Sequence, residues 1–226
     1  MSKIIKIAGY DHIEYAAQYP TEQELRDQSA AFYAMMDTRR SVREFSDRSV
    51  PIEVIENIIK TASTAPSGAH KQPWQFCVIQ NPAMKKEIRI AAEAEEKEGY
   101  ESRMSEQWKN DLLPLATTWE KPFLEIAPYL IVVFKKAYED IDNPKATNYY
   151  INESTGIACG MLISAIHQAG LVTLTHTPQP MKFLHKILNR PKNEKPFLLL
   201  PVGYPADEVF VPYIHRKPLD KVMEVY

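Results

Sequence analysis

Apolar residues recur at helical spacing in two segments near the start of the chain. Residues 20–39 predict a helix in which Thr21 caps the first turn and Glu24 completes a capping box. Residues 49–63 predict a second helix, with Ser49 as its cap. The apolar stripe of this second helix consists of Ile52, Ile55, Ile58 and Ile59.

Further along the chain, continuous apolar runs alternate with helical patterns. The prolines and glycine of residues 64–74 predict a loop, and a helix is expected from about Pro82. Residues 152–170 are apolar nearly all round and rich in Ala and Gly, which predicts a central helix. Four short apolar runs predict strands, at residues 74–80, 128–136, 171–178 and 195–205.

Two segments differ from this pattern. Residues 91–120 are highly charged and weakly apolar, which is typical of a long, marginally stable helical insertion. Residues 211–226 have little core of their own, yet they end in apolar side chains that must pack somewhere, and a second subunit is one place. The order of elements predicts a mixed sheet covered by helices on both faces, in a single α+β domain over residues 1–226.

Composition and charge narrow the possible partners. A formal charge of −2 gives no global attraction to nucleic acid or to anionic membranes, so any anion site must be local. Cys77 and Cys159 each lie in an apolar run and are expected to be buried free thiols, which suits a reducing compartment. There is no signal-peptide pattern, and the apolar runs are far shorter than the ~20 residues that cross a bilayer. We therefore expect a soluble, cytoplasmic protein.

Three arginines lie within five residues of one another, although the chain as a whole is not basic. Arg39, Arg40 and Arg43 offer planar guanidinium groups that match phosphate oxygens two at a time, and Ser41 adds a hydroxyl. This cluster is a candidate phosphate site. Composition leaves an alternative open, in which the arginines make surface salt bridges with Asp37, Glu44 and Asp47.

The loop at residues 64–74 is a second candidate site. Pro66 and Pro73 stiffen it, while Gly68 permits a tight turn or a close backbone approach. Ser67 and the backbone amide of Ala69 could donate hydrogen bonds to a ligand. The same features also suit an ordinary connection.

Two further groups of polar residues stand out. Thr175 and Thr177 end a predicted buried strand, where open sheets commonly present ligand contacts, although threonine also suits strands. Glu96 and Tyr100 share a helical face, and Lys121 follows them. A carboxylate, a phenol and an ammonium could bind a zwitterion, or they could belong to a solvated charged helix.

Several common motifs do not occur. The sequence contains no GxGxxG, Walker A, HExxH, paired CxxC or GxSxG pattern, which argues against several nucleotide, zinc and hydrolase sites. Histidines without ligand spacing give no reason to expect a metal.

Together these stretches resemble the nitroreductase-like flavoprotein superfamily. In that superfamily an N-terminal RRSVR segment, a PS loop and a late arginine bind the phosphate of FMN. The matching residues here are Arg39, Arg40, Ser41, Val42, Arg43, Pro66, Ser67 and Arg216. The resemblance implies a mixed central sheet flanked by helices, and an FMN cofactor.

A finer resemblance, to the iodotyrosine deiodinase family, covers roughly Phe32 to the C-terminus. It rests on the blocks TRRSVREFS, APSGAHKQPWQF, GLVTLTHTP, RPKNEKPFLLLPVGYP and RKPLDKVM. In that family a Glu, a Tyr and a Lys from a mobile lid hold an amino acid zwitterion, and Glu96, Tyr100 and Lys121 match them. The family's TTT segment is Thr175, His176 and Thr177 here, so His176 departs from the pattern.

The resemblance also implies the chemistry, which is FMN-dependent reductive dehalogenation of a halogenated tyrosine such as 3-iodotyrosine. Thr175, His176 and Thr177 would bind the cofactor, with the Thr177 hydroxyl at flavin N5. The amide of Ala69 would stabilise the substrate phenolate, which makes Thr177 and Ala69 the catalytic candidates. Electrons would come from outside, from NAD(P)H or a reductase.

The same resemblance implies a homodimer. Superfamily members place the site between two subunits, and their C-terminal segments embrace the partner. Two other functions stay open. A general NAD(P)H-dependent nitroreductase would share the FMN residues but would need no zwitterion clamp, and a flavin-binding or flavin-cleaving protein could use the same fold.

Overall fold

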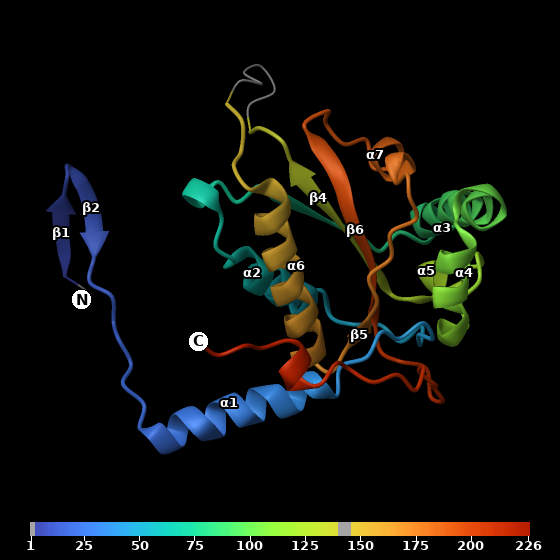
Figure 1. Ribbon diagram of the computed structural model, residues 1–226. Helices are drawn as coiled ribbons and strands as arrows, with labels where there is room; N and C mark the ends of the chain where they lie inside the picture. Colours follow the sequence, from blue (N-terminus) through green and yellow to red (C-terminus); the bar gives the residue numbers. More distant parts are fainter. Residues whose placement is uncertain (1–2, 140–145) are drawn as a thin grey trace. The chain divides into compact units, whose positions relative to one another are not determined.

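The computed structural model describes residues 3–139 and 146–226 (Figure 1). Its internal contacts divide the chain into two units, Met1–Arg39 and Arg40–Tyr226. Each is described by itself below. The expectation of a single domain over the full length stays a prediction.

The N-terminal unit contains a hairpin and one helix. Strands β1 (Ile4–Ile7) and β2 (Tyr10–Ile13) pair antiparallel, and the sequence analysis did not foresee them. Helix α1 (Glu22–Asp37) begins as predicted, because the Thr21 side chain accepts from the Glu24 amide while the Glu24 carboxylate accepts from the Thr21 amide. No residue of α1 is buried within the described chain.

The second unit is built on a four-stranded sheet in the order β3–β4–β6–β5, in which each neighbouring pair is antiparallel. The four strands are thus antiparallel, and the parallel component of the predicted mixed sheet is limited, among the described residues, to an isolated bridge between Ser41 and Thr173. The strands are β3 (Trp74–Ile79), β4 (Tyr129–Lys136), β5 (Val172–Thr173) and β6 (Glu194–Gly203).

The central strand β4 is buried on both faces, which its unbroken apolar run requires. Alternate side chains point to opposite faces. Leu130, Val132 and Phe134 join one core cluster, whereas Ile131 and Val133 join the other. Both faces must therefore be covered.

Helices cover both faces of the sheet, as the order of elements predicts (Figure 1). On one face lie α2 (Ile52–Ser63) and α6 (Ile151–Gln168), the helix expected to be central. On the other lie α3 (Pro82–Glu98), α5 (Phe123–Ile126) and α7 (Lys182–Ile187).

Between α3 and α5, the chain does not form one long helix. It passes through a π-helical turn, η2 (Gly99–Arg103), then α4 (Glu106–Leu112) and a 3₁₀ turn, η3 (Leu113–Leu115). Two further 3₁₀ turns are η1 (Gly68–His70) and η4 (Leu219–Lys221). The expected helical insertion at residues 91–120 is thus helical but broken, and its first part belongs to α3.

Two detailed predictions are wrong. Helix α2 begins after Pro51 without a side-chain cap, so Ser49 does not cap it. Of its apolar stripe, Ile55 and Ile58 are buried, whereas Ile52 at the start of the helix is 43% exposed. The strand expected at residues 171–178 is reduced to Val172–Thr173 plus an isolated bridge at His176. Pro178 and Pro180 lack the N–H donors that a longer ladder would need.

Both cysteines are free thiols, as expected. Cys159 is buried, and burial raises its pKa to about 12, whereas Cys77 is half-buried. Among the described residues, none of the helices is both long enough and apolar enough to span a bilayer.

Candidate active site

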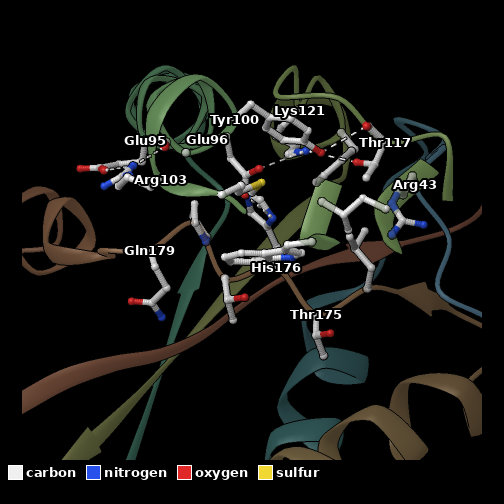
Figure 2. Close-up of a pocket in the computed structure, with 18 residues that line it drawn as sticks. Arg43, Glu95, Glu96, Tyr100, Arg103, Thr117, Lys121, Thr175, His176 and Gln179 are labelled. Carbon is white, nitrogen blue, oxygen red and sulfur yellow. Dashed lines mark hydrogen bonds and ion pairs between the residues drawn. The ribbon is translucent and has the colours of Figure 1, made fainter. Parts of the chain in front are cut away.

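A cavity of about 320 Å³ opens beside the sheet in the second unit (Figure 2). One wall comes from the end of α3 and the segments η2 and α4, and the opposite wall comes from the residues that follow β5. Its apolar lining consists of Met104, Trp108, Leu112, Phe123 and Leu174. Its predicted site residues are Arg43, Glu96, Tyr100, Lys121, Thr175, His176 and Thr177.

Glu96 and Tyr100 both line the cavity, as their spacing predicts. Helix α3 delivers Glu96, and the π-turn that follows carries Tyr100. The Tyr100 hydroxyl donates to the Thr117 carbonyl at 3.2 Å, which ties the two sides of this segment together. Such π-turns are frequent at functional sites.

Lys121 enters the cavity from the segment that leads into α5. Its ammonium lies 3.6 Å from the Glu96 carboxylate and donates to the Thr117 hydroxyl at 3.3 Å and to the Thr118 carbonyl. The Lys121 amide donates to the Glu93 carboxylate at 2.8 Å. The structure thus brings together in one polar group three residues that are spread over 25 positions of the chain, namely Glu96, Tyr100 and Lys121 (Figure 2).

Burial opposes charge on both members of this ion pair. The side chains of Glu96 and Lys121 are only 13% and 4% exposed. Burial raises the pKa of Glu96, and the neighbouring Lys121 ammonium counteracts this only in part. Burial also lowers the pKa of Lys121, against the attraction of Glu96. A ligand that gave each charge a further partner would relieve this cost.

His176 lies against the same carboxylate. Its backbone exchanges two hydrogen bonds with Leu199, at 2.9 and 3.1 Å, which fixes the residue on the sheet. Its Nδ1 atom lies 3.9 Å from Glu96 Oε1, and Phe123 packs edge-on against the ring. Burial, with Lys121 and Arg43 nearby, lowers the pKa of His176 to about 3, so the imidazole is neutral at physiological pH.

Thr175 and Thr177 are exposed and line the cavity on either side of buried His176. This is the alternation of an extended chain. Arg43 stands at one end of the cavity (Figure 2). Arg43, Thr175 and Thr177 therefore all contribute to the lining of one cavity.

Two other residues of the arginine segment are bonded to strand β5, and a third is bonded to the C-terminal tail. Ser41 forms its bridge with Thr173, and the amide of buried Val42 donates to the Thr173 carbonyl at 3.3 Å. The Arg40 guanidinium donates to the Pro212 carbonyl. Arg39 belongs to the N-terminal unit, so its position relative to this cavity is not assigned.

The remaining predicted residues lie outside the lining of this cavity. Arg216 is exposed in the C-terminal tail. In the loop, the Ser67 hydroxyl accepts from the Gln72 amide at 2.9 Å, and Pro66 is exposed. Ala69 has a left-handed backbone at φ 50°. His70 and Gln72 share this conformation, which is unusual for residues other than glycine and recurs at ligand sites. A single chain thus brings together one part of the predicted site.

The sequence analysis missed several lining residues. Thr117 is the clearest, because it contacts both Tyr100 and Lys121. It lies four residues before Lys121, a spacing that could have indicated it. Trp108 is the one large aromatic residue of the charged helix α4, and this feature could have indicated it. Nothing in the local sequence indicated Arg103, whose guanidinium lies 3.0 Å from the Glu95 carboxylate.

Comparison with known proteins identifies relatives. The nitroreductase family model matches residues 36–204. The chain is 61% identical over 215 residues to an iodotyrosine deiodinase of Haliscomenobacter hydrossis, covering 95% of this chain and 97% of that protein. It is 46% identical to human iodotyrosine deiodinase 1, covering 94% of this chain and 74% of the human protein.

Solved structures agree with these relatives. The chain resembles a crystal structure of oxidized iodotyrosine deiodinase bound to FMN and 3-iodo-L-tyrosine, with a TM-score of 0.75 at 32% identity. That match covers 86% of this chain and 98% of the other. A nitroreductase-like protein from Streptococcus mutans has a TM-score of 0.64 at 18% identity, covering 88% and 99%, which shows the shared fold.

Proposed function

This chain belongs to the nitroreductase family and, within it, to the iodotyrosine deiodinases, and from that premise we propose that it dehalogenates free halotyrosines with FMN. The observation that carries the proposal is the buried Glu96–Lys121 pair in the cavity wall. A general nitroreductase would have no need of this pair, because nitroaromatic substrates carry no ammonium and carboxylate to match it.

The pair suits a free amino acid. A zwitterion can place its α-ammonium on Glu96 and its α-carboxylate on Lys121, so that each buried charge gains a partner. Tyr100 adds a hydroxyl beside them, and apolar side chains such as Trp108 and Phe123 offer surface to an aromatic ring. A tyrosine inside a peptide lacks both charges, so it would leave Glu96 and Lys121 without these additional charged partners.

The residues present also fit FMN. Arg43, Thr175 and Thr177, which carry one cationic donor and two neutral hydroxyl donors, all line one cavity. Arg39, Arg40, Ser41, Val42, Pro66, Ser67, His176 and Arg216 complete the set that we assign to the cofactor. Arginine–phosphate bonds would hold it, and Thr177 would donate to its ring. Bound FMN supplies the two reducing electrons.

The overall reaction is balanced as follows. The carbon–iodine bond of 3-iodotyrosine breaks, a carbon–hydrogen bond forms, and two electrons and one proton convert the substrate to tyrosine and iodide. The Ala69 amide would stabilise the phenolate oxygen. Glu96, Tyr100 and Lys121 would close the segment over the ring and exclude water. An external donor, NAD(P)H or a reductase, would renew the electrons.

We assign the complete site to a homodimer. Ala69, Ser67 and Arg216 lie outside the single-chain cavity, and the tail exposes large apolar side chains. A second copy of the chain would cover this apolar surface and could bring the missing residues to the site. The cytoplasmic location remains a prediction.

The test compares Glu96→Gln with the unchanged protein. We expect kcat/KM for 3-iodotyrosine, assayed as iodide release under anaerobic dithionite reduction, to fall about 10- to 100-fold, as loss of a charged hydrogen bond implies. Glu95→Gln is the matched control, because Glu95 pairs with Arg103 and not with Lys121.

FMN retention and the reduction of a nitroaromatic should be unchanged in both variants. If the unchanged protein reduces nitroaromatics but releases no iodide, the chain is a general nitroreductase. If it consumes FMN in the presence of oxygen, it is a flavin-cleaving protein.

A further inference from the structure

His176 shares the carboxylate of Glu96 with Lys121. Glu96 Oε2 faces the Lys121 ammonium at 3.6 Å, while Oε1 faces His176 Nδ1 at 3.9 Å. The two oxygens of one carboxylate are thus divided between a cation and a ring nitrogen. All three side chains are nearly buried, so none can exchange its neighbour for water easily.

The imidazole is held in place on several sides. Two backbone hydrogen bonds to Leu199 fix its strand position. Phe123 packs against the ring at a centroid distance of 5.9 Å and an angle of 87°. Its Nε2 atom is buried and has no hydrogen-bond partner among the residues that the structure describes. The ring therefore has one nitrogen near a carboxylate and one without a donor or acceptor.

These surroundings select one form of the ring. Burial, reinforced by the nearby Lys121 and Arg43 charges, disfavours a positive charge on it, so the imidazole carries a single proton. A proton on Nδ1 faces the Glu96 carboxylate, which is an acceptor, whereas a proton on Nε2 would find no acceptor within the described part of this chain. The Nδ1–H tautomer is the one that the site stabilises.

We propose that His176 is a positioning residue, whose neutral Nδ1–H holds the Glu96 carboxylate in place when a substrate zwitterion takes Lys121 away from it. The inference rests on the proposed function. In the ligand-free arrangement Lys121 holds one oxygen of Glu96. Once Lys121 turns to the substrate carboxylate, the Nδ1–H closes from 3.9 Å to hydrogen-bonding length, about 3 Å.

A neutral donor is what this position requires. A protonated histidine would add a positive charge next to the spot where the substrate ammonium binds, and would repel it. A shorter side chain such as threonine, which the family pattern has at this position, would not extend as far towards Glu96. His176 thus gives this chain an additional hydrogen-bond donor to Glu96, the residue that binds the substrate ammonium.

The test uses three substitutions of one residue in the FMN-loaded protein. His176→Thr removes the ring. His176→Asn places an amide N–H near the position of Nδ1, and His176→Gln places one near the position of Nε2. Affinity for 3-iodotyrosine is measured with oxidised FMN by quenching of flavin fluorescence, so that binding is read without turnover.

We expect His176→Thr to weaken 3-iodotyrosine binding about tenfold. His176→Asn should restore most of the loss, and His176→Gln should not. Binding of 3-(3-iodo-4-hydroxyphenyl)propanoate, which lacks the ammonium, should change little in any variant. Equal affinity of His176→Thr and the unchanged protein would overturn the inference, and so would rescue by Gln in place of Asn.

The pH dependence of binding gives a second readout that a merely structural role would not move. The groups that face Glu96 are Lys121, Arg103, Tyr100 and His176. Donation from Nδ1 stabilises the ionised carboxylate, so its removal raises the pKa of Glu96 further. The acid limb of the affinity profile should shift to higher pH in His176→Thr, but not in His176→Asn.

A double-mutant cycle separates action through Glu96 from other effects. If His176 acts through Glu96, His176→Thr should cost little in a Glu96→Gln background. Full additivity would contradict the proposal. Failure of the proposed function looks different, because the unchanged protein would then release no iodide from 3-iodotyrosine.

Discussion

Glu96 and Lys121 show how a binding site can be costly to the fold that carries it. Lys121 is buried and Glu96 is largely so, and burial shifts the pKa of each towards its neutral form in spite of the partner. Buried pairs of this kind often contribute little net stability, but removal of one member leaves an uncompensated charge. Under the proposed function, the ligand charges that they would bind account for their presence.

This balance predicts the stabilities of three variants. Lys121→Met should lower the free energy of unfolding by about 3 kcal/mol, because it leaves Glu96 without its closest cation. The double variant Glu96→Gln/Lys121→Met should recover most of this loss. Denaturant unfolding at a fixed, saturating FMN concentration measures both, and a double variant no more stable than Lys121→Met would contradict the account.

The pH dependence of the Lys121→Met loss follows from the sign of the shift. The pKa of Glu96 in the folded protein lies above its ordinary value. The folded state then binds protons more readily than the unfolded state, so stability rises as pH falls through this window. The penalty should therefore shrink at mildly acidic pH and be full near neutrality.

The segment between α3 and α5 depends on a few contacts for its order. A short π-turn, a seven-residue helix and a 3₁₀ turn follow one another, and the Tyr100–Thr117 hydrogen bond links their two ends. Short helices such as these are marginal without tertiary support. We expect this segment to be the lid, opening when the cavity is empty and ordered by the substrate.

Two tyrosine substitutions separate lid order from fold stability. Tyr100→Phe removes the hydrogen bond to Thr117 and should weaken 3-iodotyrosine binding about threefold to tenfold, with an unchanged melting temperature. Tyr129→Phe is the matched control. It removes a buried hydrogen bond of 3.0 Å to the Val50 carbonyl, so it should lower the melting temperature and leave affinity unchanged.

Limited trypsin digestion measures directly how well the lid segment is ordered. The segment contains Arg103 and Lys109 as cleavage sites, and Lys97 lies just before it, in the last turn of α3. We expect 3-iodotyrosine to protect them in the unchanged protein and in Tyr129→Phe, and to protect them less in Tyr100→Phe. Equal protection in all three would show that the Tyr100 hydroxyl does not order the lid.

The chain by itself leaves apolar surface uncovered. In the tail, Tyr213, Val225 and Tyr226 are at least 82% exposed. Apolar side chains exposed in such number are typical of an interface. The proposed homodimer would account for both this surface and the residues that lie outside the single-chain cavity.

Substitution within the tail tests this assembly. Changing Leu219, Val222, Met223 and Val225 to Ser should reduce the particle mass from twice 26.0 kDa towards that of one chain, and weaken FMN binding. Changing the charged residues of the same stretch, Asp220, Lys221 and Glu224, should leave both unchanged. Light scattering after gel filtration measures the mass, and an unaltered dimer in the first variant would exclude the tail as an interface.

Local patterns were sufficient for much of the secondary structure. The capping box at Thr21 predicted the start of α1, because its partners are three residues apart. The unbroken apolar run of β4 predicted a strand buried on both faces, since side-chain alternation leaves no polar face. The prediction that Ser49 caps α2 was wrong, because a polar residue can precede a helix without capping it. The N-cap position of α2 is Pro51.

The sequence therefore specified the elements, the fold class and the types of residue that the chemistry needs, because those depend on neighbours along the chain and on motif order. The local sequence pattern did not show whether Glu96, Lys121 and His176 meet, since each comes from a different part of the chain. Only the family resemblance grouped Glu96 with Lys121. Folding placed Lys121 and His176 each within 4 Å of Glu96, and left all three side chains largely shielded from solvent. Their altered pKa values, and the sharing of one carboxylate, follow from that placement alone.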